Sequence, residues 1–127
     1  MSNLQAALGL AQLERIDELL EKKQHIFEEY RKHLPIVERH VKNVKDSHWM
    51  ITVLLDMPKE TAMEKLKEKG IDTRPVFYPL SVLKPYKHSK ADTPIAKAIS
   101  KKGINLPSGA CLTDEEIQYI CKEVLAL

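Results

Sequence analysis

The sequence predicts an α+β fold in which a long N-terminal helix is followed by a small, mostly antiparallel sheet covered by helices. Apolar residues recur at helical spacing over four stretches of the chain. Between these lie shorter stretches rich in β-branched residues and bounded by Gly, Pro or Asp, as is typical of strands. With 127 residues, the chain is expected to form a single domain over 1–127 with a core of its own.

The first helix is predicted over residues 2–34, because Ser2 and Gln5 fit a capping box and no proline interrupts the stretch. Residues 4–13 are apolar on nearly every side, whereas from Glu14 onward the apolar residues form one stripe. An apolar surface on all sides needs a cover. Either this segment is buried within the domain or dimerises, or the part of the protein that covers it is missing from this chain.

The later elements alternate between strands and helices. Gly70 is expected to cap the end of the second helix, and Thr113 with Glu116 fits a capping box at the start of the last one. A long loop over 79–91 is expected to be functional. Strands are predicted over residues 49–55, 71–78 and 104–106, an irregular strand over 36–44, and helices over 61–69, 93–102 and 114–125.

Composition excludes several classes of protein. The 20 Lys and Arg residues against 18 Asp and Glu leave a charge of +2, which argues against a dedicated nucleic-acid-binding protein. No apolar run approaches the roughly 18 residues that a membrane span needs, and no signal peptide is recognisable, so we expect a cytoplasmic protein without a membrane partner. Cys111, Cys121 and the five histidines show no ligand spacing, so no metal site is expected.

The segment 72–81 carries the densest candidate chemistry. Pro75 and Pro79 restrict its backbone, and the segment presents an Arg, two aromatic residues and a Ser. A guanidinium can bind a carboxylate or phosphate through two hydrogen bonds, and aromatic rings can cover a sugar, a base or a planar cofactor. The alternative is a rigid edge segment whose aromatic residues pack on the core. His48 and Trp49, at the start of a predicted strand, form a second candidate group.

Three segments together resemble one family. They are MSNLQAALGLAQLERID (1–17), GIDTRPVFYPLS (70–81) and the 105–121 region with NLPSG and LTDEEIQYIC. In this order they resemble the C-terminal small domain of the DegT/DnrJ/EryC1/StrS family of PLP-dependent sugar aminotransferases, which have the type I aminotransferase fold. The loop sequence Thr-Arg-Pro at 73–75, with Leu-Pro-Ser-Gly at 106–109, is most similar to that of perosamine-synthase-like members, which aminate a nucleotide-linked 4-keto-6-deoxy sugar.

The resemblance implies a set of partners and site residues. The full-length enzyme would be a homodimer that uses pyridoxal 5'-phosphate, an amino acid donor (glutamate) and a nucleotide-linked sugar in polysaccharide biosynthesis. Arg74 and Phe77 would line the sugar-nucleotide site, with Tyr78 and Ser81 as neighbours. Many relatives have His where Ser81 stands, so a role that needs that His is not expected here. His48 and Trp49 match the start of the strand that faces the site.

The resemblance also implies what this chain lacks. The family's Schiff-base lysine lies upstream in a large domain, and no lysine here matches it. We therefore expect no catalytic and no cofactor-binding residue in this chain, no PLP bound to it alone and no transamination by it alone. Residues 1–34 would pack on the missing large domain or the dimer partner; in the isolated chain, residues 4–13 would form an exposed patch, dimerise or fray. The alternatives are a stand-alone, non-catalytic dimerisation or interaction domain and one half of a split aminotransferase.

Overall fold

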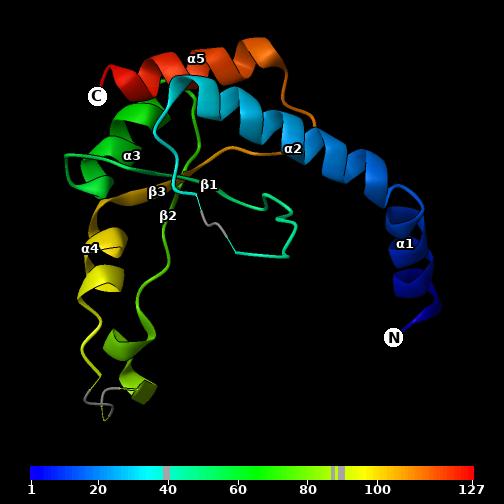
Figure 1. The fold of residues 1–127 in the computed structure, drawn as a ribbon, viewed down its shortest axis with the longest axis horizontal. Coiled ribbons are helices and arrows are strands. Elements are labelled where there is room, and N and C mark those ends of the chain that lie inside the picture. Colours follow the sequence, from blue (N-terminus) through cyan, green and yellow to red (C-terminus); the bar gives the residue numbers. More distant parts are fainter. Residues whose placement is uncertain (39–40, 87, 89–90) are drawn as a thin grey trace.

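The computed structural model describes residues 1–38, 41–86, 88 and 91–127, and it shows five α-helices and a small sheet (Figure 1). The elements in chain order are α1 (Asn3–Leu13), α2 (Ile16–His33), β1 (Ile51–Leu54), α3 (Lys59–Glu68), β2 (Arg74–Pro75), the 3-10 helices η1 (Leu80–Val82) and η2 (Lys84–Tyr86), α4 (Pro94–Lys102), β3 (Gly103–Leu106) and α5 (Asp114–Leu125). The predicted α+β class is confirmed.

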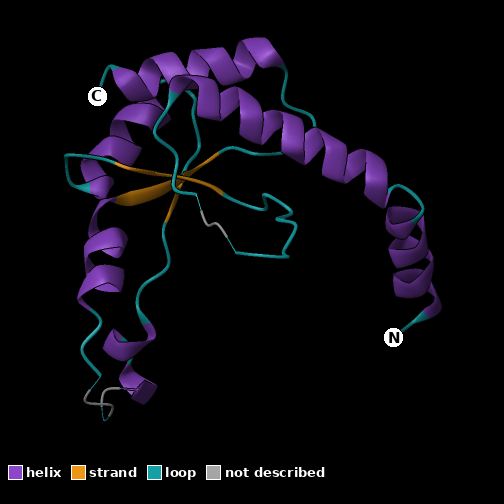
Figure 2. Cartoon of the chain, viewed as in Figure 1, coloured by secondary structure: helices purple, strands orange, loops and turns teal. Residues whose placement is uncertain are grey.

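The three strands form an antiparallel sheet in the order β1-β3-β2 (Figure 2). Ile51 of β1 faces Leu106 of β3, and Arg74 of β2 faces Asn105. The sheet is smaller than predicted: residues 71–78 supply only the two-residue β2. Of the strand predicted over 36–44, residues 39 and 40 lie outside the described residues, and the described ones form one bridge, between Ile36 and Val53. Pro75 and Pro79 lack the N–H that a longer ladder would need.

The core lies between one face of this sheet and three helices. Alternate residues of β1 and β3 turn to that face, and the apolar stripes of α2, α3 and α5 cover it. The buried hydrophobic residues that form this cluster are Ile26, Tyr30, Leu34, Ile51, Val53, Leu66, Ile71, Ile104, Leu106, Ile117, Ile120, Cys121 and Val124. In Figure 1, α2 and α5 lie side by side above the sheet.

The predicted helix over 2–34 is interrupted at one point. Glu14 and Arg15 form a turn, Arg15 has non-helical backbone angles (φ −111°, ψ 10°), and α1 bends away from the axis of α2 (Figure 1). No residue of α1 is buried, and Leu4 and Leu8 are 81% and 64% exposed. The exposed patch, one of the three outcomes expected for residues 4–13, is thus present.

The turn after α3 and the loop before α4 complete the architecture. Gly70 has a positive φ of +77°, the left-handed conformation that glycine tolerates at a helix end, as predicted. The predicted loop over 79–91 contains η1 and η2, and its residues 87, 89 and 90 lie outside the described residues. In the described part of the chain, no helix is both long and apolar enough to cross a lipid bilayer.

Candidate functional site

Arg74 lies in the edge strand β2, on the sheet face opposite the core. It is in register with Asn105 of β3, which in turn faces Thr52 of β1. Its Nη2 donates to Oδ2 of Asp72 at 2.9 Å, and 77% of the Arg74 side chain is exposed. Exposed ion pairs of this kind contribute little, so a phosphate or carboxylate ligand can displace Asp72 from the guanidinium.

The two aromatic residues after β2 are presented to solvent. Phe77 is 68% exposed and Tyr78 is 61% exposed, so the alternative in which they pack on the core is wrong. Nζ of Lys59 lies 4.5 Å from the centroid of the Tyr78 ring and donates to the Ser100 carbonyl oxygen at 2.7 Å. Lys59 is itself buried, so this cation–π contact orients the Tyr78 ring against the helices.

Arg74 and Tyr78 border a cleft of about 440 Å³ between the 72–78 segment and the exposed side of α3. Its charged lining is balanced, since Lys59, Lys67 and Arg74 lie against Glu60, Glu64 and Asp72. Ser81 does not line this cleft. The Ser81 hydroxyl lies 2.8 Å from the hydroxyl of Thr93, and this contact joins the two ends of the intervening loop.

Two side-chain contacts hold the His48 ring against α2, and a local hydrogen bond fixes its backbone. Its φ is +47°, a left-handed conformation, and its backbone N–H donates to Oδ1 of Asp46 at 2.8 Å. The imidazole stacks on Phe27 with the ring centroids 3.9 Å apart, and its Nε2 lies 2.8 Å from Oε1 of Gln24. These contacts fix the ring at the border of a second cleft, which Phe27, Asp46 and Met50 also line.

A junction centred on Lys23 positions Trp49. Nζ of Lys23 donates to the carbonyl oxygen and the hydroxyl of Ser108, at 2.6 and 2.9 Å, and to the Trp49 carbonyl at 3.2 Å. Burial lowers the pKa of the Lys23 ammonium. The Trp49 side chain is left 69% exposed. Sequence reasoning singled out Trp49 and Tyr78 but neither of their lysine partners, Lys23 and Lys59; Ser108 had a signal only as part of the NLPSG motif.

The structure does not bring the six predicted site residues into one cluster. Because β1 and β2 are both antiparallel to β3, they run in the same direction. Trp49 precedes β1, whereas Phe77 follows β2, three residues beyond the row that contains Thr52 and Arg74. At about 3.3 Å per residue, Trp49 and Phe77 lie roughly 20 Å apart along the strand direction of the sheet.

The described lysines do not fit the imine that PLP forms with an aminotransferase. Such a lysine faces the cofactor with a free amine. Among the described residues, Lys59 is buried, Lys23 and Lys97 are partly exposed, and the other lysines are exposed. The first three donate to oxygen acceptors: Lys23 and Lys59 as above, and Lys97 to Oδ1 of Asp92 at 3.0 Å. No chemical step through PLP is therefore assigned to these residues.

Sequence comparison finds relatives along nearly the whole chain. The profile of the DegT/DnrJ/EryC1/StrS aminotransferase family matches residues 1–125. The chain is 37% identical over 129 residues to a GDP-perosamine synthase of Escherichia coli O157:H7, and the match covers 98% of this chain and 35% of the relative. It is also 37% identical over 131 residues to a GDP-perosamine synthase of Vibrio cholerae, covering 95% of this chain and 36% of the relative.

Solved structures agree with this assignment. DesI, determined in the presence of its TDP-sugar product, superposes with a TM-score of 0.86 at 25% identity, over 98% of this chain and 35% of DesI. The putative sugar aminotransferase Spr1654 of Streptococcus pneumoniae, in its PMP form, gives a TM-score of 0.85 at 26% identity, over 98% and 34%. The chain spans about a third of the length of the curated relatives it matches. It belongs to the DegT/DnrJ/EryC1/StrS aminotransferase family.

Proposed function

We propose that this chain is the C-terminal, substrate-closing part of a PLP-dependent aminotransferase. The complete enzyme would transfer an amino group from an amino acid, with glutamate as the expected donor, to a nucleotide-linked 4-keto-6-deoxy sugar. The observation that carries this proposal is the family match over residues 1–125, together with 37% identity to two GDP-perosamine synthases. Because such sugars are made in the cytoplasm for surface polysaccharides, the enzyme is expected to act there.

In this proposal the group around Arg74 contacts the substrate. The Arg74 guanidinium would bind the diphosphate through two hydrogen bonds after releasing Asp72, and the exposed rings of Phe77 and Tyr78 would cover the sugar or the base. Ser81 would hold the loop behind them through Thr93. One sugar ring cannot reach across the sheet to Trp49, so His48 and Trp49 would serve a second site. The expected homodimer provides two sites.

We assign the exposed face of α1 to a contact within the complete enzyme. Leu4, Leu8 and Leu13 are each more than half exposed, and no residue of α1 is buried. Apolar surface of this extent usually marks an interaction site. Residues 1–34 would therefore pack on the lysine-bearing domain or on the dimer partner. The chain alone would neither bind PLP nor transaminate.

Two measurements on the natural gene product test the proposal. An antibody to this domain should detect a species much heavier than 14.5 kDa in the source cells. The purified species, loaded with PLP, should convert a GDP-linked 4-keto-6-deoxy sugar to the amino sugar in the presence of glutamate, with mass spectrometry as the readout. Failure of the PLP-loaded protein to aminate GDP-linked and dTDP-linked keto sugars with any amino acid donor would refute the proposal.

A matched pair of charge-removing variants tests the site within that enzyme. Arg74→Gln should raise KM for the nucleotide sugar by about tenfold or more, since a charge-assisted bond to phosphate is lost. Lys122→Gln removes the same charge from an exposed residue of α5, outside the cleft and outside residues 1–34, and should leave KM unchanged. Equal KM values for the two variants would remove Arg74 from the substrate site.

The exposed α1 also favours a second candidate, a stand-alone dimerisation domain. In that case the natural product would have a mass of 14.5 kDa and would dimerise in sedimentation equilibrium. Leu8→Glu, at a residue 64% exposed, would abolish the dimer, whereas Asn3→Glu, on the other side of the same helix, would not. A split aminotransferase would instead show PLP absorbance only after a second, lysine-bearing protein is added.

A further inference from the structure

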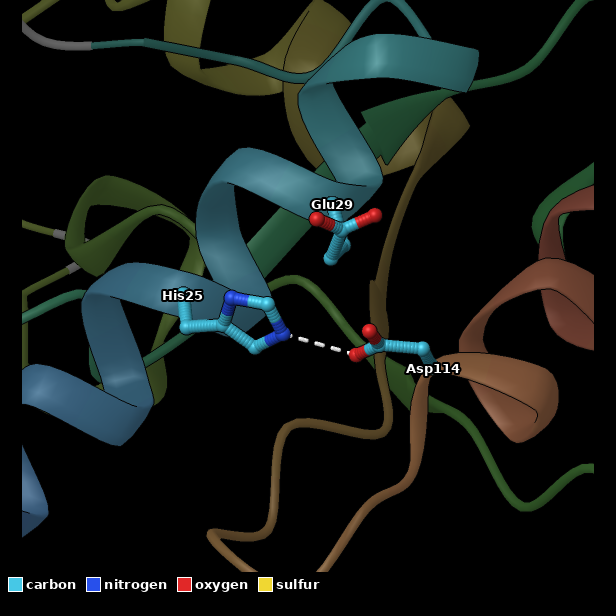
Figure 3. A group of neighbouring side chains, drawn as sticks. All are labelled: His25, Glu29 and Asp114. Carbon is cyan, nitrogen blue, oxygen red and sulfur yellow. Dashed lines mark hydrogen bonds and ion pairs between the residues drawn. The ribbon is translucent and has the colours of Figure 1, made fainter.

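Outside the candidate site, the chain brings three metal-ligating side chains together where α2 meets α5 (Figure 3). His25 and Glu29 lie one turn apart on the same face of α2, and Asp114 is the first residue of α5. One ligand atom from each residue lies within 4.8 Å of the other two. The closest pair is Nε2 of His25 and Oδ1 of Asp114, which are 2.7 Å apart.

We propose that His25, Glu29 and Asp114 bind a divalent first-row transition-metal ion, with Zn²⁺ as the best match. Imidazole nitrogen and carboxylate oxygen are both donors to Zn²⁺, and in zinc sites with three protein ligands water fills the remaining position. In tetrahedral coordination these donors are about 3.4 Å apart, so small side-chain rotations would suffice. The two carboxylates with a neutral imidazole carry a charge that balances the ion.

The backbone positions of the three ligands are held by the core beneath them. Ile26 and Tyr30, next to the ligands on α2, are buried, and so are Ile117 and Ile120 on α5. The capping box formed by Thr113 and Glu116 fixes the first turn of α5, where Asp114 lies. Ligands on packed helices lose little freedom on binding, which favours affinity.

One ion pair opposes binding and limits the affinity. The Glu29 carboxylate forms an ion pair with Lys32, which a metal ion must displace. Lys32 has 60% of its side chain exposed and can move into solvent, whereas the Glu29 side chain is 12% exposed and stays in place. The side chains of His25 and Asp114 are 55% and 51% exposed, so water retains access and can complete the coordination.

Zinc binding to the 127-residue chain tests the proposal directly. Isothermal titration with ZnCl2 should give one saturable site, and the visible spectrum of added Co²⁺ should show nitrogen and oxygen ligation. Because the ion would join α2 to α5, saturating metal should raise the melting temperature by roughly 5–10 °C. The absence of saturable binding at concentrations up to about 1 mM would overturn the proposal.

Variants with matched controls identify the ligands. His25→Ala and Asp114→Asn should each weaken Zn²⁺ binding by at least about tenfold while circular dichroism shows an unchanged fold. His33→Ala removes another exposed imidazole of α2, and Cys111→Ser removes the exposed thiol; both should bind as the wild type does. Wild-type affinity in His25→Ala, or lost binding in Cys111→Ser, would place the ion elsewhere and refute this site.

Discussion

The hydroxyl of Tyr30 gives a prediction whose magnitude follows from the structure. Tyr30 is fully buried in α2, and its hydroxyl donates to the Pro107 carbonyl at 2.9 Å, joining the helix to the segment after β3. In Tyr30→Phe the ring still fills its place in the core, so little cavity forms. The loss is one hydrogen bond, worth about 1 kcal/mol net, plus part of the cost of an unpaired carbonyl. We expect the free energy of unfolding to fall by about 1–2 kcal/mol.

Tyr119→Phe is a matched control for this variant. The Tyr119 hydroxyl also donates to a backbone carbonyl, that of Lys69, at 3.0 Å, but Tyr119 is 45% exposed. Water can therefore replace the lost donor, and the expected change in the free energy of unfolding is below about 0.5 kcal/mol.

Urea unfolding monitored by circular dichroism measures both variants. With a slope of about 1.5 kcal/mol per molar urea, the midpoint for Tyr30→Phe should fall by about 1 M at an unchanged slope. Equal midpoint shifts for the two variants would refute the reasoning, because they would mean that burial of the bond has no effect. A Tyr30→Phe midpoint within experimental error of the wild type would refute it as well.

Three further predictions concern pH, close packing and thiol exposure. Burial, aided by the charge of Cys121, raises the pKa of Tyr30 above its usual value near 10. The neutral phenol's contribution to stability is therefore complete below pH 10 and is lost above it. In urea titrations, the stability difference between wild type and Tyr30→Phe should shrink above about pH 10. In Gly103→Ala the new Cβ would lie 2.6 Å from Cγ2 of Val76 and 2.8 Å from the Ile99 carbonyl oxygen, so we expect the free energy of unfolding to fall by about 2–3 kcal/mol. Gly9→Ala, with nothing within 4 Å of the new Cβ, should cause no such loss. Equal thermal midpoints for the two variants would contradict this. Burial raises the pKa of the Cys121 thiol to about 11, while Cys111 is exposed. A disulfide reagent should therefore modify only Cys111 quickly in the native chain and both thiols in urea. Fast modification of both thiols in the native chain would be inconsistent with this core.

The sequence predicted the elements best where local signals agree. The last helix was predicted over 114–125 and found over Asp114–Leu125, because a capping box and a stripe of buried residues both mark it. The break between α1 and α2 has no such signal, since neither Gly nor Pro stands at Glu14 or Arg15. The predicted strand over 71–78 shrank to β2 because pairing depends on a partner, and the outer edge of β2 has none among the described residues.

The candidate site shows a similar limit. The residue types of Arg74 and its aromatic neighbours indicated a surface for ligands, and the structure leaves these side chains exposed, while their binding role stays a prediction. Their distance from Trp49 could not be predicted, because it depends on the strand order β1-β3-β2, which the pattern of apolar residues does not encode. The contact between His25 and Asp114 could not be predicted either, because the two residues are 89 positions apart in the chain and only the fold brings them within hydrogen-bond distance.

The strand order also determines when this chain can fold during synthesis. Within the described residues, β1 and β2 each pair in the sheet with β3, which is the last strand to leave the ribosome. Until then Ile51 and Val53 have no partner beyond the single bridge to Ile36, and closing the sheet joins residues about 50 positions apart. The sheet can therefore close only after β3 has been synthesised. A ribosome that stalls before Gly103 would release a chain in which β1 and β2 are unpaired and the apolar side chains of Ile51 and Val53 lack their cover from β3, a substrate for chaperones and proteases.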